Sequence, residues 1–324
     1  MQLPTYDDVM AARARIAPHV VRTPMLRHRL LDERTGGTVL IKAEPLQRTG
    51  SFKLRGATNA LQRLDAAGRA AGVVTHSSGN HGQATACAAA TLGMRATIFM
   101  PEDAPRIKMQ STRGWGADIV TYDRARDDRD ALTRAFADRE GAVLVPPFDH
   151  PDVIAGQGTL ALELAEDAAA AGLVMDAFLA CTGGGGLIAG CALALEGASP
   201  TTQIYAVEPE GWDDTARSLA SGARLANAPG GSTLCDSLLS KMPGEITFAV
   251  NQPRLSGGLV VTDAEVLAAI AFAFSHLKLV VEPGGAVCLA ALLAGKFDAK
   301  GRVVGAVISG GNVDAAVFNR ALAA

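Results

Sequence analysis

The chain has 324 residues, of which 48% are hydrophobic and 19% are charged, and its formal net charge is −3 at pH 7. That length suffices for one large or two modest domains, and the composition is ordinary for a soluble globular protein. Because there is no excess of positive charge, the sequence predicts neither a nucleic-acid partner nor a membrane partner. Asp7 and Asp8 lie near the N-terminus and no apolar segment surrounds them, so the segment does not resemble a secretory signal. We therefore expect a cytoplasmic protein.

Five cysteines are scattered along the chain: Cys87, Cys181, Cys191, Cys235 and Cys288. Their number is odd and no two form a C-x-x-C pair, so neither a zinc site nor a disulfide framework is predicted. We expect buried free thiols.

One stretch, residues 177–195, contains no charged residue and is almost long enough for a membrane helix. Four consecutive glycines at 183–186 interrupt it. Glycines in that position favour a turn between two short elements instead.

From residue 72 onward, short apolar runs alternate with helix-forming stretches. In a first series, strands are expected at 73–75, 96–100, 119–122 and 142–145, and helices at 81–92, 104–115 and 127–139. In a second series, strands are expected at 177–181, 203–207 and 303–308, and helices at 159–171, 187–195, 264–277 and 285–293. Such alternation predicts an α/β fold with parallel sheets. We expect a small domain over 72–149 and a large domain formed by 1–71 and 150–324, with 221–255 left unassigned.

Glycine-rich turns follow three of the expected strands, at 77–80, 183–186 and 309–312. In open α/β sheets, ligands bind at the carboxyl ends of the strands. The four glycines precede an expected helix, so main-chain N–H groups and the positive helix end would converge and cradle a phosphate. The same loop also fits a dinucleotide fingerprint, in which Gly184, Gly186 and Ala189 are followed by Glu208. A nicotinamide-dependent oxidoreductase is therefore an alternative.

Lys53 stands beside the aromatic Phe52, just inside an expected helix. A lysine with a lowered pKa can form a Schiff base with an aldehyde cofactor, although an isolated lysine is more often a surface residue. The loop at 77–82 combines hydroxyl groups, an amide and a helix N-terminus, which together suit a substrate carboxylate.

These segments resemble the fold type II pyridoxal-phosphate enzymes, specifically the threonine/serine dehydratases and serine racemases. The resemblance covers nearly the whole chain and rests on the segments 51–53, 77–82, 153–158, 183–186, 208–209, 282–284 and 309–312. It implies two open parallel-sheet domains, as in the β subunit of tryptophan synthase, with pyridoxal 5′-phosphate in the cleft between them. The large domain would bind the cofactor, and the small domain would close over the substrate.

The resemblance also implies roles for individual residues. Lys53 would carry the cofactor and take the α-proton of the substrate. The cofactor's ring and phosphate would be contacted by Phe52, Asn80, Gly183, Gly184, Gly185, Gly186 and Ser309. The substrate carboxylate would be bound by Ser77, Asn80 and His81. Because the Ser309 hydroxyl is neutral, it would not keep the ring nitrogen protonated, which favours expulsion of a β-hydroxyl over transamination.

Three further expectations follow from the same resemblance. Ser78 would exchange a proton on the face opposite the lysine, as in serine racemases. Arg129 would meet a second substrate carboxylate and so favour 3-hydroxyaspartate over threonine. Mg²⁺ or Ca²⁺ would be bound by the carboxylates of Glu208 and Asp214 and the main-chain carbonyl of Trp212.

We therefore predict a dehydratase, or ammonia-lyase, that converts L-threonine or L-serine to a 2-oxo acid and ammonia. The alternatives are 3-hydroxyaspartate as substrate, with serine racemisation as a side activity, and a non-enzymatic amino-acid-binding regulator on the same scaffold. Phe148 and Ser237 stand where serine racemases usually have asparagine and glycine, so the chain departs from a strict racemase. We expect no C-terminal regulatory domain, and family analogy predicts a homodimer.

Overall fold

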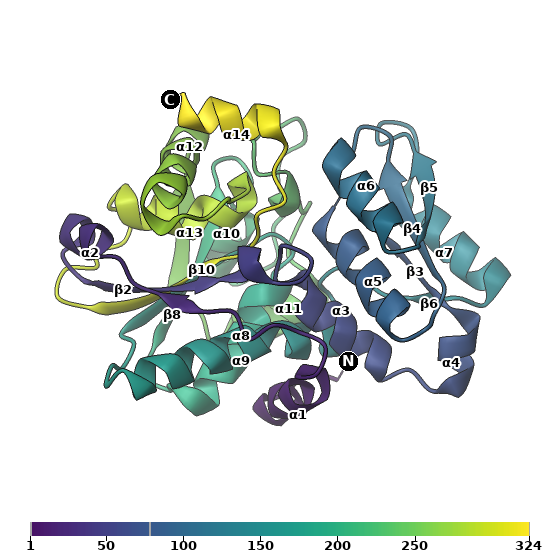
Figure 1. Cartoon of the computed structure of the whole chain (residues 1–324), viewed down its shortest axis with the longest axis horizontal. Coiled ribbons are helices and arrows are strands. Elements are labelled where there is room, and N and C mark those ends of the chain that lie inside the picture. The colour runs from purple at the N-terminus through teal and green to yellow at the C-terminus, as the bar shows by residue number, and fades with distance from the viewer. Residues whose placement is uncertain (1, 78, 324) are drawn as a thin grey trace.

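The computed structural model describes residues 2–77 and 79–323, which form two α/β bodies, each built on its own sheet (Figure 1). The strands of the larger sheet are β1 (Met25–Leu26), β2 (Thr38–Ala43), β7 (Ala177–Cys181), β8 (Gln203–Pro209), β9 (Gly257–Val261) and β10 (Val303–Ile308). Those of the smaller sheet are β3 (Val73–His76), β4 (Ala96–Pro101), β5 (Asp118–Tyr122) and β6 (Val143–Leu144).

Helices cover both sheets. The helices up to the end of the small body are α1 (Tyr6–Ile16), α2 (Arg29–Thr35), α3 (Lys53–Gln62), α4 (Ala66–Ala71), α5 (Asn80–Thr91), α6 (Arg106–Gly114) and α7 (Arg129–Glu140). Those after it are α8 (Pro151–Ala170), α9 (Gly186–Ala198), α10 (Asp214–Ser221), α11 (Glu245–Asn251), α12 (Asp263–Phe272), α13 (Pro283–Leu293) and α14 (Ala315–Leu322). Short 3₁₀ turns lie at Glu44–Leu46 and Asp236–Leu238, and α12 continues as a π-helical turn over Ala273–Leu277.

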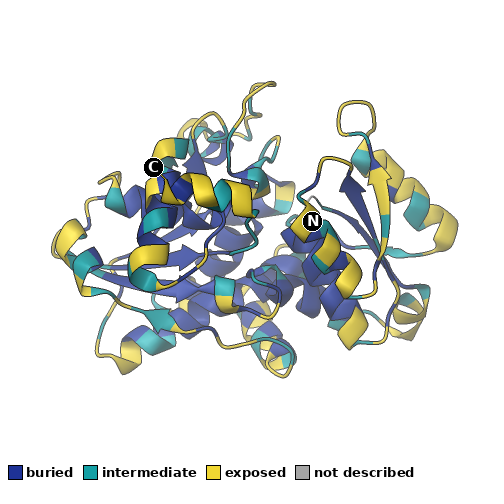
Figure 2. Cartoon of the chain, turned by 45° about the horizontal axis from the view of Figure 1, so that its top comes forward, coloured by how far each residue is buried: buried dark blue, intermediate teal, exposed yellow. Residues whose placement is uncertain are grey.

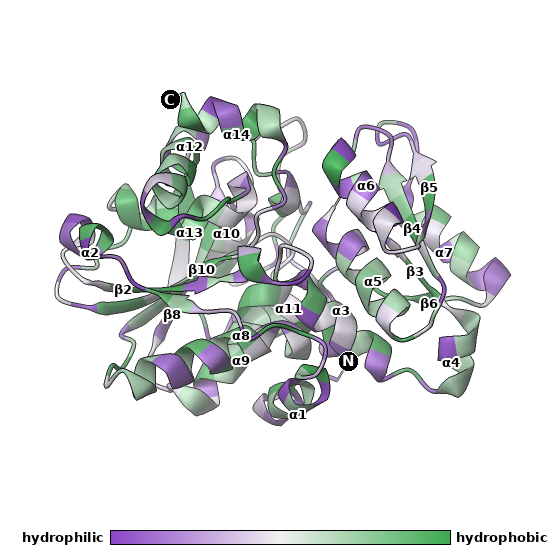
Figure 3. Cartoon of the chain, viewed as in Figure 1, coloured by the Kyte–Doolittle hydropathy of each residue, from purple (hydrophilic) through white to green (hydrophobic). Residues whose placement is uncertain are grey.

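Both sheets are essentially parallel, which confirms the predicted fold class. The large sheet has the order β1-β2-β10-β7-β8-β9 and the small one β5-β4-β3-β6. Among the strands of the described residues, the two-residue β1 alone is antiparallel, to β2. The four central strands of the large sheet, β2, β10, β7 and β8, are mostly buried under helices, whose outer faces are exposed (Figure 2). Hydrophobic residues run along β2 accordingly, while hydrophilic ones gather on the outer helix surfaces (Figure 3).

Helix α8 begins at Pro151, eight residues before the predicted start. Gly156 and Gly158 obscured its periodicity, and close packing explains both of them. A Cβ on Gly156 would lie 2.6 Å from the carbonyl oxygen of Arg55, and one on Gly158 would lie 2.3 Å from that of Gly190. These glycines therefore let α8 pack directly against α3 and α9.

The uncharged stretch 177–195 is divided, as predicted, between β7 and α9 with the glycine turn between them. Within residues 2–77 and 79–323, no helix is both long and apolar enough to span a membrane. All five cysteines are free and buried, as expected.

Helix α3 lies between the two bodies (Figure 1). Its residues Leu54, Ala57 and Leu61 belong to the core of the small body, together with Val153 of α8. Helix α4, which follows it, also lies beside the small sheet in Figure 1. The predicted domain boundary at 71/72 stays a prediction, but α3 is clearly shared by both bodies.

Candidate active site

A cavity opens between the two bodies, where the carboxyl ends of β3, β7 and β10 face the starts of α3, α5 and α9. Its walls contain every predicted cofactor and substrate residue that the structure describes: Phe52, Lys53, Ser77, Asn80, His81, Arg129, Gly183, Gly184, Gly185, Gly186 and Ser309. Ser78 lies outside the described residues. Parallel strands explain this convergence, because their carboxyl ends share one edge of each sheet.

Lys53 is the first residue of α3, and its amine points into the cavity wall. The amine donates a hydrogen bond of 2.7 Å to the carbonyl oxygen of Pro147. The neighbouring Phe52 is tied to the large sheet by its N–H, which donates to the carbonyl of Ser309 at 3.0 Å. Burial lowers the pKa of Lys53 from 10.5 to about 8. A much larger fraction of this amine is therefore neutral, and nucleophilic, than of an exposed lysine.

This lowered pKa predicts how cofactor uptake depends on pH. Only the neutral amine attacks an aldehyde, and a fall from 10.5 to about 8 raises the neutral fraction near pH 7 by roughly 300-fold. The rate at which the apoenzyme takes up pyridoxal phosphate should therefore rise about tenfold per pH unit below pH 7 and level off near pH 8. Stopped-flow absorbance measures this rate, with Nα-acetyl-lysine as the control for the cofactor's own titration. A rate that kept rising to pH 10 would contradict the assignment.

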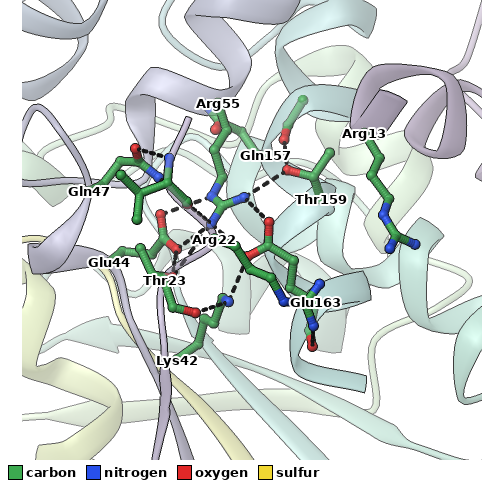
Figure 4. A network of polar contacts seen from close by, with 12 residues as sticks. Arg13, Arg22, Thr23, Lys42, Glu44, Gln47, Arg55, Gln157, Thr159 and Glu163 are labelled. Carbon is green, nitrogen blue, oxygen red and sulfur yellow. Dashed lines mark hydrogen bonds and ion pairs between the residues drawn. The ribbon is translucent and has the colours of Figure 1, made fainter. Parts of the chain in front are cut away.

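A buried ionic network holds the helix that carries Lys53. The guanidinium of Arg55, fully buried, bonds Glu44 at 2.9 and 3.0 Å and Glu163 at 2.8 and 2.9 Å, and Lys42 bonds Glu163 at 2.6 Å (Figure 4). Burial alone would lower the pKa of Arg55, but the two carboxylates raise it, so the guanidinium stays charged. Two cations and two anions make this cluster neutral. It joins the start of α3 to β2 and α8.

The glycine loop 183–186 has the geometry of an anion cradle. Gly185 adopts φ 91°, a left-handed conformation, and caps the start of α9. The carbonyl of Gly184 accepts a hydrogen bond of 2.7 Å from the Thr247 hydroxyl, while the N–H groups of the first turn of α9 have no intrahelical partner. A Cβ on Gly184 would lie 2.4 Å from the ring of Phe148. The aromatic residue that departs from the racemase pattern therefore packs directly on the loop, which only glycine permits.

Ser309 follows β10 and lies in the cavity wall, 5% exposed. The Cys181 thiol donates to its hydroxyl oxygen at 3.2 Å. The Ser309 hydroxyl therefore keeps its own proton available for an acceptor in the cavity, as its predicted role toward the ring nitrogen requires. Ser237, the other departure from the racemase pattern, also lines the cavity and packs on Gly284, where a Cβ would lie 2.1 Å from the Ser237 hydroxyl.

The side chain of His81 is not available to an anion. Burial lowers its pKa to about 3, so the ring is neutral. Its Nε2 lies 3.1 Å from the carbonyl oxygen of Val145, which can only accept, so Nε2 must carry the proton. The predicted role of His81 in carboxylate binding thus narrows to its main-chain N–H at the start of α5.

Two residues of the cavity that sequence patterns did not single out, Lys108 and Asp236, connect the bodies. The Lys108 amine, on α6 of the small body, bonds Asp236 at 2.7 Å and lies 3.1 Å from Glu282 of the large body. Glu282 also accepts a hydrogen bond from the Asn80 amide. A Cβ on Gly79 would lie 2.3 Å from Cδ of Lys108, so the lysine side chain passes through the space that such a Cβ would fill. A lysine in an ordinary amphipathic helix gives no sequence signal for such a bridge.

The predicted metal ligands lie outside the cavity, where β8 ends and α10 begins. The Glu208 carboxylate accepts the main-chain N–H groups of Thr215 and Ala216 at 2.9 and 2.8 Å. One oxygen of the buried Asp214, Oδ2, has no hydrogen-bond partner among the described residues. No group of three or more His, Cys, Asp and Glu side chains in the described part of the chain could hold a metal ion. The two carboxylates with one free oxygen still suit a cation that is completed by carbonyl groups and water.

A partly neutral lysine, an anion-binding glycine loop and a buried hydroxyl around one interdomain cavity define an enzyme that carries pyridoxal phosphate. The residues fit the group: Lys53 would hold its aldehyde, the loop 183–186 its phosphate and Ser309 its ring nitrogen. Glu208 does not line this cavity, so its carboxylate is not placed to bind a ribose there, as the nicotinamide alternative requires.

Comparison with known proteins agrees. The chain belongs to the pyridoxal-phosphate dependent enzyme family, whose model matches residues 16–310. It is 45% identical to an L-threo-3-hydroxyaspartate ammonia-lyase of Pseudomonas sp, over 97% of each chain. It is 41% identical to a serine racemase of Schizosaccharomyces pombe, over 96% of this chain and 95% of the relative. The crystal structure of a threonine deaminase from T.th. superposes with a TM-score of 0.89 at 42% identity, covering 96% of this chain and 99% of the other.

Proposed function

We propose that this enzyme is an ammonia-lyase for 3-hydroxyaspartate. Loss of the β-hydroxyl as water, followed by hydrolysis of the C–N bond, would give oxaloacetate and ammonia. The observation that carries the proposal is Arg129, which lines the cavity and whose nearest carboxylate, Asp130, is 4.0 Å away. A guanidinium so placed can pair with the second carboxylate of hydroxyaspartate but gains nothing from the methyl group of threonine.

The sequence alone favoured L-threonine or L-serine as the substrate and gave 3-hydroxyaspartate as an alternative. The present proposal reverses that ranking. The similarity to the Pseudomonas hydroxyaspartate ammonia-lyase supports the change, since it slightly exceeds the similarity to the serine racemase. The other arginine of the cavity, Arg124, already bonds Asp103 at 3.1 and 3.2 Å. Arg129 is therefore the better candidate for the substrate.

Individual residues of the cavity have different roles in the proposed reaction. When bound, the cofactor supplies the electron sink for the substrate's α-carbon. Lys53, with its lowered pKa, takes the α-proton. Ser77 accepts the N–H of Gly79 at 3.1 Å, which leaves its hydroxyl proton for the substrate's α-carboxylate beside the start of α5. The small body excludes water from the reacting carbon.

Arg129→Ala should lower kcat/KM for L-threo-3-hydroxyaspartate roughly 100-fold, because a charge-assisted pair is lost. Turnover of L-threonine should change little. Steady-state release of 2-oxo acid measures both substrates. Arg134→Gln, an exposed arginine on the same helix, is the matched control. If the wild-type enzyme preferred threonine, or Arg129→Ala lowered both substrates equally, the proposal would be wrong.

We also propose that a divalent cation binds at Glu208, Asp214 and the carbonyl of Trp212. The free Asp214 oxygen supports it. Millimolar MgCl₂ or CaCl₂ should then raise the Tm of the holoenzyme, and Asp214→Asn should abolish that rise. Asp213→Asn, one residue earlier, should keep it. A Tm that does not respond to either salt would contradict the site.

The assembly and side activity expected from the family resemblance are likewise proposals. We propose a cytoplasmic homodimer, so sedimentation equilibrium should give twice the chain mass of 33.3 kDa. Chiral analysis of L-serine incubated with the holoenzyme tests for racemisation.

A further inference from the structure

The His76 ring and the Asp130 carboxylate form a hydrogen bond at the edge of the cavity. His76 is the last residue of β3, precedes the predicted carboxylate-binding Ser77, and is 8% exposed. Asp130 is the second residue of α7 and directly follows Arg129. The two side chains meet at 2.9 Å between Nε2 and Oδ1. The pair therefore links the ligand edge of the small sheet to the helical turn that carries Arg129.

The rest of α7 is held by other contacts. Farther along the helix, Phe136 packs edge-to-face on Phe99 of β4, with ring centroids 5.6 Å apart. The first turn is capped by Asp128, whose carboxylate accepts the N–H groups of Asp130 and Ala131 at 2.9 and 3.1 Å. This cap belongs to the same turn and does not attach it to the sheet. The hydrogen bond between the side chains of Asp130 and His76 attaches this turn to the sheet.

The same Asp130 carboxylate lies between His76 and Arg129 in its contacts. The Arg129 Nε lies 4.0 Å from Asp130 Oδ2, so a small rotation of Asp130 would bring the two into contact. The bond to His76 holds Asp130 by its other oxygen. It also lowers the pKa of Asp130 to about 2, so that this carboxylate stays ionised and bound to the histidine. The Arg129 guanidinium is thus left 4.0 Å from Asp130, beyond hydrogen-bond distance.

We propose that His76 and Asp130 are positioning residues that keep Arg129 directed at the second carboxylate of the substrate, and so set the preference for dicarboxylic over monocarboxylic ligands. This inference rests on the proposed function. Neither residue contacts the reacting atoms in this scheme. The bond to His76 holds the Asp130 carboxylate away from Arg129, and the same bond attaches the first turn of α7 to β3. Removing the histidine should therefore do two things: loosen the turn and release a competing carboxylate beside Arg129.

The test uses the holoenzyme and two non-reacting probes, succinate with two carboxylates and butyrate with one. His76→Ala should weaken succinate binding about tenfold, the value expected for one charge-assisted hydrogen bond, and leave butyrate within about twofold. Isothermal titration calorimetry measures both. His76→Gln, which keeps an N–H donor, should restore part of the succinate affinity. In the His76→Ala background, Asp130→Ala should also restore part of it, because the competing carboxylate is gone.

Equal weakening of both probes would overturn the inference, because it would show general damage to the cavity. An unchanged affinity of His76→Ala for succinate would also overturn the inference. Failure of the proposed function gives a different result, since the wild-type holoenzyme would then bind succinate no better than butyrate and Arg129→Ala would change neither.

Discussion

Lys53→Ala should lower turnover of any amino-acid substrate by at least about 10⁴-fold. The substitution removes both the covalent attachment of the cofactor and the base that takes the α-proton. The purified variant should also lack the visible absorption of the lysine-bound cofactor, and borohydride should leave no cofactor mass on the chain. Turnover and intact-mass measurements check both parts.

The matched control is Lys300→Ala. Lys300 is an exposed lysine just before β10, and so lies at the end of that strand opposite the cavity. This variant should keep the chromophore and full activity. Lys53→Arg tests whether a cation at this position is enough, since arginine keeps the charge but neither forms the attachment nor loses a proton near neutral pH, and it should be as inactive as Lys53→Ala. A Lys53→Ala enzyme that retained turnover would falsify the assignment of this residue.

Arg55→Met should lower the free energy of unfolding by about 3–5 kcal/mol. Arg55 is fully buried and bonds both Glu44 and Glu163. Removing it leaves two buried carboxylates with the single cation of Lys42, and such an uncompensated buried charge is costly. Urea denaturation of the holoenzyme measures the loss.

Arg22→Met provides the matched control. Arg22 lies at the rim of the same region, where it bonds Glu166 and Asp167 with a side chain that is 47% exposed, and exposed pairs contribute at most about 1 kcal/mol. The double variant Arg55→Met with Glu44→Gln restores charge neutrality and should recover part of the lost stability. If Arg55→Met and Arg22→Met had equal effects, the network would not be the main anchor of α3.

Much of the site could be predicted from the sequence because its loops have short-range causes. A strand followed by four glycines and a helix must present N–H groups at one point, and the structure confirms that Gly183 to Gly186 line the cavity. Parallel strands bring such loops to one edge, so the convergence of Ser77 and Ser309 on the glycine loop also followed from pattern, whereas the place of Lys53 beside them was implied by the family resemblance. The N-terminal helices α1, α2 and α4 were not predicted, and α3 was expected only as a helix that begins near Lys53, because their apolar residues are few and their packing partners lie far along the chain.

Long-range contacts defined the rest. No pattern around Arg55 indicates that Glu44 and Glu163, which lie 11 and 108 residues away, would meet it in the core. Likewise, the Lys108 bridge to Asp236 joins residues 128 positions apart. His81 illustrates the reverse, since its motif suggested an anion ligand and its environment left the ring neutral with its one proton donated to Val145.

The sequence by itself determined the α/β class and the glycine loops, because each depends on residues adjacent in the chain, and the family resemblance of several separate segments pointed to Lys53. Only the tertiary structure decided the chemical state of these residues. Burial in the cavity wall gives Lys53 its lowered pKa, and the Arg55 network anchors the helix that carries it. The tertiary structure also placed Arg129 in the cavity wall, 4.0 Å from its nearest carboxylate, Asp130, while Arg124 bonds Asp103 at 3.1 Å. The electrostatic interactions of a charged side chain depend on neighbours that folding brings from elsewhere in the chain. For this reason, only the folded structure shows which charged groups surround Arg129.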